Sequence, residues 1–171
     1  MTISRRDLLL QTGLAAGAAV VVARAGTSAA QAAPPTKATY TPVIVPNGTT
    51  LPYDTVDGVK VFQLTAEPVP HEFAPGLKIE AWGYNGSTPG PLIEVVEGDK
   101  VRIYVTNDLP EQTSVHWHGV FLPNGMDGVA GLNQKAIPVG KTFKYEFTFT
   151  KPGTFMYHPH FDGMTQIALG M

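Results

Sequence analysis

The chain has 171 residues and a formal net charge of −2, and 43% of its residues are hydrophobic while only 15% are charged. This length suits one domain with additional segments, and the apolar content is sufficient for a buried core. The near-neutral charge gives no indication of nucleic-acid binding. The sequence contains no cysteine, which excludes disulfides, cysteine-based zinc sites, iron–sulfur clusters and, within these residues, a blue-copper site.

Residues 1–32 have the features of an export signal. Arg5-Arg6 precedes an apolar run, and Ala30-Gln31-Ala32 fits an A-x-A cleavage site. The paired arginines resemble a twin-arginine signal. A membrane anchor is the alternative, but the run is short, rich in Gly and Ala and followed by Arg24, so a stable membrane span is disfavoured. We therefore expect a bacterial protein that is exported to the periplasm or secreted.

The rest of the chain has the pattern of a turn-rich β-protein. Residues 33–57 are rich in Pro, Thr and Gly, which indicates an extended arm or, alternatively, a linker. From Gly58 onward, short apolar or alternating segments are separated by turns. Seven strands are expected, at residues 59–64, 77–82, 92–96, 101–106, 113–118, 143–149 and 154–158. Short strands at this spacing predict an all-β fold, a β-sandwich formed by residues 58–171.

The end of the chain resembles the start of another strand. Residues 166–171 are mostly apolar, whereas chain termini usually fall in polar, exposed segments. We therefore expect the last strand to be incomplete and the chain to be a C-terminally truncated fragment of a longer protein.

Four of the five histidines lie in two His-x-His motifs, His116-Trp117-His118 and His158-Pro159-His160. Side chains at i and i+2 of a strand point to the same face, so each motif places two imidazoles side by side. Imidazole suits Cu, Zn, Fe and Ni, and clustered neutral imidazoles are costly to bury unless a metal takes their lone pairs. The motifs thus predict a metal site, whereas the lone His71 is interpreted as a surface or satisfied core residue.

Three segments carry a resemblance to a known family: His116-Trp117-His118-Gly119, Pro123-Asn124-Gly125-Met126-Asp127-Gly128 and Gly153-Thr154-Phe155-Met156-Tyr157-His158-Pro159-His160. In this order they resemble the first cupredoxin domain of multicopper oxidases, a family that includes laccase-like and copper-resistance-type oxidases. The resemblance extends over residues 58–171. It implies a cupredoxin-like (plastocyanin-like) Greek-key β-sandwich.

The resemblance also implies the roles of individual residues. The family oxidises a reducing substrate at a type 1 copper and passes electrons to a trinuclear copper cluster, where O₂ is reduced to water. The first domain supplies half of the cluster's histidines. His116 resembles the ligand of the type 2 copper, His118 and His158 resemble ligands of one type 3 copper, and His160 resembles a ligand of the other. Asp127 resembles a carboxylate that aids proton delivery, and a turn residue before Gly128 is its equally weighted alternative.

The chain departs from the family pattern at a few positions. Met156 stands where the family often has Trp, and Pro159 where Ser is common, and both changes leave the ligands intact. Lys135-Ala136 replaces a frequent Cys-Pro, so a disulfide there is lost. Four of the five methionines are interpreted as packing residues, since an axial-ligand role would need a cysteine nearby; they are Met126, Met156, Met164 and Met171.

Two hypotheses of function remain. In the first, the chain is the N-terminal part of an exported copper-dependent oxidase, whose partners are O₂, a reducing substrate and the cupredoxin domain or domains that complete the cluster. The parent protein would then be an enzyme and the chain alone inactive. In the second, the chain is a stand-alone copper-binding module without catalysis. The sequence does not indicate which substrate the oxidase would use.

Overall fold

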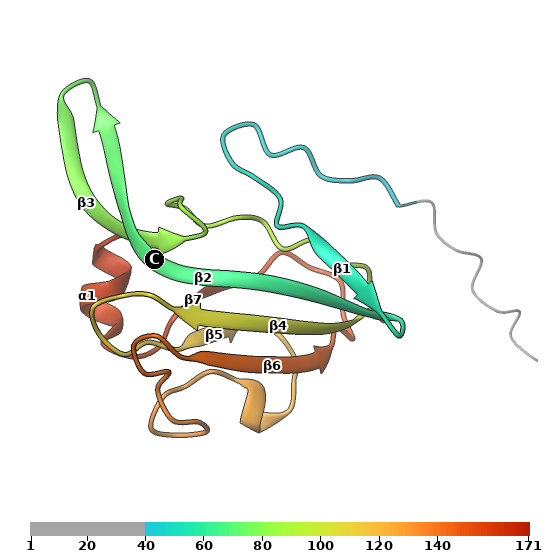
Figure 1. Ribbon diagram of the computed structural model, residues 1–171. Coiled ribbons are helices and arrows are strands. Elements are labelled where there is room, and N and C mark those ends of the chain that lie inside the picture. The colour runs from blue at the N-terminus through green and yellow to red at the C-terminus, as the bar shows by residue number, and fades with distance from the viewer. Residues whose placement is uncertain (1–39) are drawn as a thin grey trace, which may run out of the picture. The chain divides into compact units, whose positions relative to one another are not determined.

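The computed structural model describes residues 40–171; the predicted export signal and the first residues of the predicted arm lie outside the described residues. Strands form most of the regular structure in this part of the chain (Figure 1). They are β1 (Tyr53–Val56), β2 (Val59–Ala74), β3 (Leu77–Tyr84), β4 (Lys100–Asn107), β5 (Val115–His118), β6 (Thr142–Thr148) and β7 (Met156–Pro159). A 3-10 turn, η2 (Asn124–Met126), and a short helix, α1 (Gly163–Ala168), accompany them.

The larger sheet is organised around the long strand β2. Its first half pairs with β1 in antiparallel and with β4 in parallel, and its second half pairs with β3 in antiparallel. Strand β6 then pairs with β4 in antiparallel. Asp57 and Gly58 form the two-residue turn between β1 and β2 with φ values of 50° and 76°, which a type I′ hairpin requires. Strand β1 lies within residues 33–57, so part of the expected arm is a strand of the sheet.

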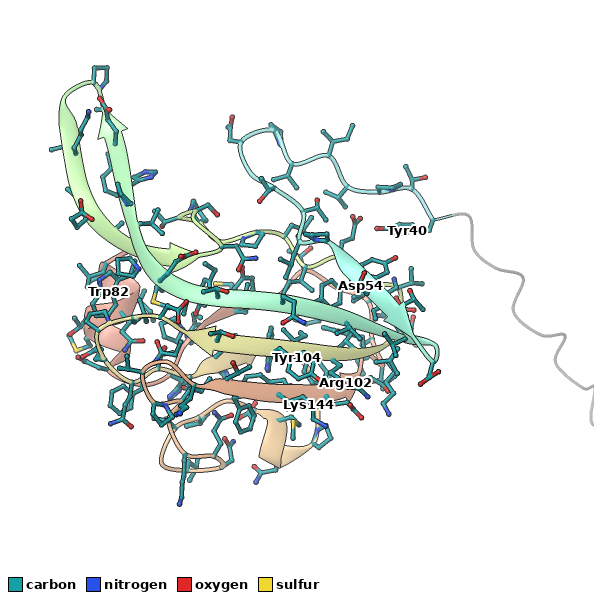
Figure 2. All side chains as sticks on the ribbon, viewed as in Figure 1. Tyr40, Asp54, Trp82, Arg102, Tyr104 and Lys144 are labelled. Atoms are coloured by element: carbon teal, nitrogen blue, oxygen red, sulfur yellow. The ribbon has the colours of Figure 1, made fainter. Side chains whose placement is uncertain are left out.

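The alternation of residues in β4 and β6 decides which face of this sheet is buried. Every second residue of β4 is fully buried, namely Val101, Ile103, Val105 and Asn107. The residues between them lie on the polar face, and Figure 2 shows Arg102 and Tyr104 there beside Lys144 of β6. The predicted period of two is therefore confirmed in both strands.

Strands β5 and β7 form a second, two-stranded sheet that packs against the first. The ring of Trp117 in β5 is almost fully buried and lies 5.3 Å, centroid to centroid, from the ring of Tyr145 in β6. It also contacts Phe147, at 5.7 Å. The two sheets thus share one apolar core, as the predicted sandwich requires, and Trp117 is part of it.

The expected strand at residues 92–96 is not present. Only Leu92 forms a bridge, to Thr50, and its backbone N–H and C=O bond to the segment at residues 49–51. Glu94 contributes a side-chain contact instead, because its Oε1 accepts a hydrogen bond from the Val43 amide at 2.7 Å. Residues 49–51 lie between Pro46 and Pro52, whose rings restrict the backbone, and only this short segment pairs with Leu92.

The strand expected at residues 166–171 is also wrong, because Gly163–Ala168 forms the helix α1. A short apolar run cannot be assigned to strand or helix from its periodicity alone. The side chain of Gln166 is fully buried in this helix, and the carbonyl of Leu169 accepts a hydrogen bond from the amide of Trp82 in β3. Within residues 40–171, no helix has the length and apolarity needed to cross a membrane.

Candidate metal centre

Both His-x-His motifs lie in the two-stranded sheet, and its register brings them together. His116 of β5 is paired directly with His158 of β7, while His118 is paired with Met156. His160 follows the end of β7, where its amide donates a hydrogen bond to the carbonyl of Ser114 at 3.3 Å. The ring of His116 is central, because its centroid lies 5.3–5.4 Å from those of the other three histidines.

Three of the four histidines form a compact set of ligand atoms. One ring nitrogen from each of His116, His118 and His158 lies within 4.8 Å of the others. Within it, His118 Nδ1 and His158 Nε2 lie 3.1 Å apart. His160 is outside this set, although its ring centroid is 5.3 Å from that of His116 and 6.3 Å from that of His158. His71 lies far along β2 and packs against Phe73.

The geometry of these nitrogens fits a transition-metal ion. Imidazole–metal bonds are about 2 Å long, so two ligands of one ion lie about 3–4 Å apart. The 3.1 Å separation of His118 Nδ1 and His158 Nε2 meets this requirement without a change of backbone. The donor set consists of imidazoles, with no thiolate among residues 1–171, which suits copper, zinc, iron or nickel.

Backbone carbonyls fix which nitrogen of two histidines can bind a metal. The carbonyl of Asp127 lies 2.6 Å from His116 Nδ1, and the carbonyl of Pro159 lies 2.9 Å from His158 Nδ1. A carbonyl oxygen only accepts hydrogen bonds, so in both rings Nδ1 carries the proton. The lone pair of each ring is therefore on Nε2, and such partners orient metal-binding histidines in general.

Burial favours the neutral form of His158. Desolvation lowers the pKa of His158, and the positive charges that His116, His118 and His160 would carry when protonated lower it further, while the Pro159 carbonyl opposes the shift. A neutral imidazole is the form that binds metals.

The carboxylate of Asp127 also lies beside His116. Its Oδ1 is 3.4 Å from His116 Nδ1, longer than the 2.6 Å contact of the backbone carbonyl, so the carbonyl is the principal acceptor. Its Oδ2 accepts a hydrogen bond from Asn133 Nδ2 at 3.1 Å. Asp127 ends η2, which agrees with the alternative of a turn residue. Its carboxylate lies beside the His116 ring, which agrees with the alternative of a carboxylate that aids proton delivery.

Other residues that support the site carried no signal in the sequence. Tyr145 Oη of β6 accepts a hydrogen bond from the amide of Val115, next to His116. Gln166 bonds to Thr113 Oγ1 at 2.7 Å, to Glu111 Oε1 at 2.7 Å and to the carbonyl of Gln112 at 2.8 Å. These bonds tie α1, which follows His160, to the segment that leads into β5.

The methionines are not all packing residues. Met126 and Met171 pack against the core, and the amide of Glu146 contacts Met126 Sδ at 3.3 Å. Met156 and Met164, by contrast, are 64% and 90% exposed. The interpretation of these two residues as packing side chains is therefore wrong, because they do not pack into the core that residues 40–171 form.

Known proteins resemble this chain in sequence. A family model described as multicopper oxidase matches residues 65–171. Copper resistance protein A of Escherichia coli is 45% identical over 85 residues, which are 50% of this chain and 14% of that protein. Dihydrogeodin oxidase of Aspergillus terreus is 41% identical over 124 residues, which are 70% of this chain and 19% of that protein.

Solved structures extend the likeness to three dimensions. A multi-copper oxidase from Pseudomonas thermotolerans superposes with a TM-score of 0.65 and 39% identity, over 66% of this chain and 28% of that chain. This likeness confirms the predicted cupredoxin-like fold. The chain thus spans less than a third of the length of these relatives.

Proposed function

The chain belongs to the multicopper oxidase family, whose cofactor is copper, and we propose that it is the N-terminal part of an exported oxidase. In this proposal residues 58–171 are the first cupredoxin domain and supply half of a trinuclear copper cluster. The whole protein would be an oxidoreductase with O₂ as electron acceptor. The observation that carries the proposal is the set of three imidazole nitrogens within 4.8 Å of one another, with His160 beside them.

The four histidines are divided among three coppers in this proposal. His118 and His158 would hold one type 3 copper, which their facing nitrogens at 3.1 Å support. His116 would hold the type 2 copper through Nε2, since its Nδ1 is bonded to the Asp127 carbonyl. His160 would hold the other type 3 copper, which agrees with its position outside the compact set. Bound copper would supply the one-electron transfers that reduce O₂ to water while a reducing substrate is oxidised.

The surrounding residues would orient the imidazoles and manage protons. The carbonyls of Asp127 and Pro159 keep Nδ1 of His116 and His158 protonated, so that Nε2 of each ring faces the metal. The Asp127 carboxylate, 3.4 Å from His116, would hold a proton for delivery during O₂ reduction. Met156, exposed and paired with His118, lies on the face that a second cupredoxin domain would cover.

A stand-alone copper-binding module is the second candidate function. Its support is that the side chains of His118 and His160 are exposed. Among the described residues, no second domain covers them, so a metal ion in solution can reach them. The gene sequence downstream of the Met171 codon distinguishes the two candidates. A reading frame that continues and encodes a His-Cys-His motif supports the oxidase, and a natural stop codon after Met171 supports the module.

A copper titration of the purified 171-residue chain tests the site itself. We expect Cu(II) binding with an ordinary type 2 paramagnetic signal. The double change His116→Ala with His118→Ala should remove most of the binding, because it deletes two of the three histidines whose ring nitrogens lie within 4.8 Å of one another. His71→Ala is the matched control and should bind like the unchanged chain. Unaltered affinity in the double variant would contradict the proposal.

Export through a twin-arginine route is a separate part of the proposal, supported by Arg5-Arg6 and the Ala30-Gln31-Ala32 site. Fusion of residues 1–40 to a reporter that is active only after export would test it. Changing Arg5 and Arg6 together to Lys should abolish reporter activity. Retention of full activity in that variant would contradict this route.

A further inference from the structure

The contact between His116 and Asp127 is made by the main chain. The Asp127 carbonyl is 2.6 Å from His116 Nδ1, whereas the nearer carboxylate oxygen is 3.4 Å away. The position of the backbone at Asp127 therefore determines that Nδ1 is the protonated nitrogen of His116. The Asp127 carboxylate is not needed for this. Whatever holds this segment against β5 also selects Nε2 as the metal-binding atom of His116.

Asn133 closes the loop that contains this segment. Its Oδ1 accepts a hydrogen bond from the amide of Val129 at 2.9 Å, and its Nδ2 donates one to Asp127 Oδ2 at 3.1 Å. Its own amide donates to the carbonyl of Val129 at 3.1 Å. One half-buried side chain thus joins both ends of residues 127–133.

The loop also approaches β5 closely at Gly128. A Cβ atom at this position would lie 1.8 Å from the Val115 carbonyl oxygen and 2.8 Å from the His116 Cα atom. The segment therefore has little freedom to shift toward β5. The hydrogen bonds of Asn133, which link Asp127 to Val129 across the turn, fix the shape of the loop, and the backbone pairing of Ile137 with Thr113 holds its far end beside the segment that leads into β5.

We propose that Asn133 is a positioning residue that holds the Asp127 carbonyl against His116 and so keeps His116 in the tautomer that binds metal through Nε2. The inference rests on the proposed function of His116 as a copper ligand. Asn133 touches neither the metal nor a substrate in this account. It acts through the backbone at Asp127, and the Asp127 carboxylate serves as its anchor.

The test uses the metal-free chain first. Long-range proton–nitrogen NMR at pH 8 reports which nitrogen of His116 carries the proton. We expect a single Nδ1-protonated form in the unchanged chain and a mixture of both tautomers in Asn133→Ala. Asp127→Asn should retain the single form, because an amide at that position still accepts a hydrogen bond from Asn133 and the carbonyl is unchanged. Asn124→Ala, at an exposed position in η2, is the matched control.

A rescue variant separates positioning from general stability. Asp127→Asn combined with Asn133→Asp exchanges donor and acceptor across the same contact and keeps an acceptor for the Val129 amide. We expect this double variant to restore the single tautomer, whereas Asn133→Asp alone should not, because two carboxylates would then face each other. A double variant that resembles Asn133→Ala, or an Asn133→Ala chain that keeps one tautomer, would overturn the inference. If Asn133→Ala does not fold, the rescue variant still decides.

Copper affinity then links the tautomer to metal binding. We expect the Kd for Cu(II) to rise about 10-fold to 100-fold in Asn133→Ala, which is the usual effect of losing a residue that orients a metal ligand. The Kd should recover when Asp127→Asn and Asn133→Asp are combined. An unchanged Kd in a chain with mixed tautomers would overturn the link. Absence of copper binding in the unchanged chain would instead contradict the proposed function, and the NMR result would still decide the role of Asn133.

Discussion

Replacing Gly128 with alanine should force the loop at Asp127 away from β5. The residue has φ of 82°, a left-handed backbone that costs a side-chain-bearing residue about 1–2 kcal/mol. Its Cβ would also lie 1.8 Å from the Val115 carbonyl oxygen, and relief of such overlap costs about 1–3 kcal/mol more. We therefore expect Gly128→Ala to lower the free energy of unfolding by about 2–5 kcal/mol.

Gly131 provides a matched control for this change. It lies in the same loop with the same φ of 82°, but a Cβ atom there would meet nothing within 4 Å. Gly131→Ala should therefore cost only the backbone term of about 1–2 kcal/mol. Urea denaturation followed by circular dichroism measures both values. If Gly128→Ala proves no more destabilising than Gly131→Ala, the close approach of the loop to β5 is wrong.

Three further predictions concern the stability and the activity of the chain. Gln166→Ala should lower the unfolding free energy by about 1–3 kcal/mol in urea denaturation, because buried polar partners lose their hydrogen bonds, while Thr165→Ala, at an exposed position of α1, should cost less. Arg102, assisted by Lys100, lowers the pKa of Glu146 from 4.5 to about 2, so this carboxylate stabilises the fold above its unfolded pKa. That contribution should be lost as the pH falls from about 5 to about 2, and the acid dependence of the melting temperature should be shallower in Glu146→Gln. The isolated chain should show neither turnover of a phenolic substrate nor an intense blue absorption with copper, since it contains no cysteine, and copper-dependent turnover in an oxygen electrode would contradict this.

Much of the β-scaffold could be predicted because its strands alternate regularly. The four buried residues of β4 and the aromatic residues of β6 lie on the core side as their period of two requires. Two of the errors fall where an apolar run is short. Residues 92–96 and 166–171 have no clear period, and their structure is decided by contacts with Thr50 and with the segment before β5, which are distant in the sequence.

The candidate site was predictable only in part for a similar reason. The spacing of each His-x-His motif places two imidazoles on one face of a strand, but it does not indicate that His116 would lie opposite His158. That pairing depends on the register between β5 and β7. The role of Asn133 was also hidden, because its two side-chain hydrogen bonds depend on the shape of the loop, and a loop Asn has no distinctive spacing.

The most direct test of a copper site is to locate the metal. Crystals of the chain grown with Cu(II) would be measured on both sides of the copper absorption edge, so that anomalous differences identify copper. We predict the strongest anomalous peak about 2 Å from both His118 Nδ1 and His158 Nε2, the pair that is already 3.1 Å apart. A strongest peak at His71, or full copper occupancy away from all four histidines of the two motifs, would contradict the account.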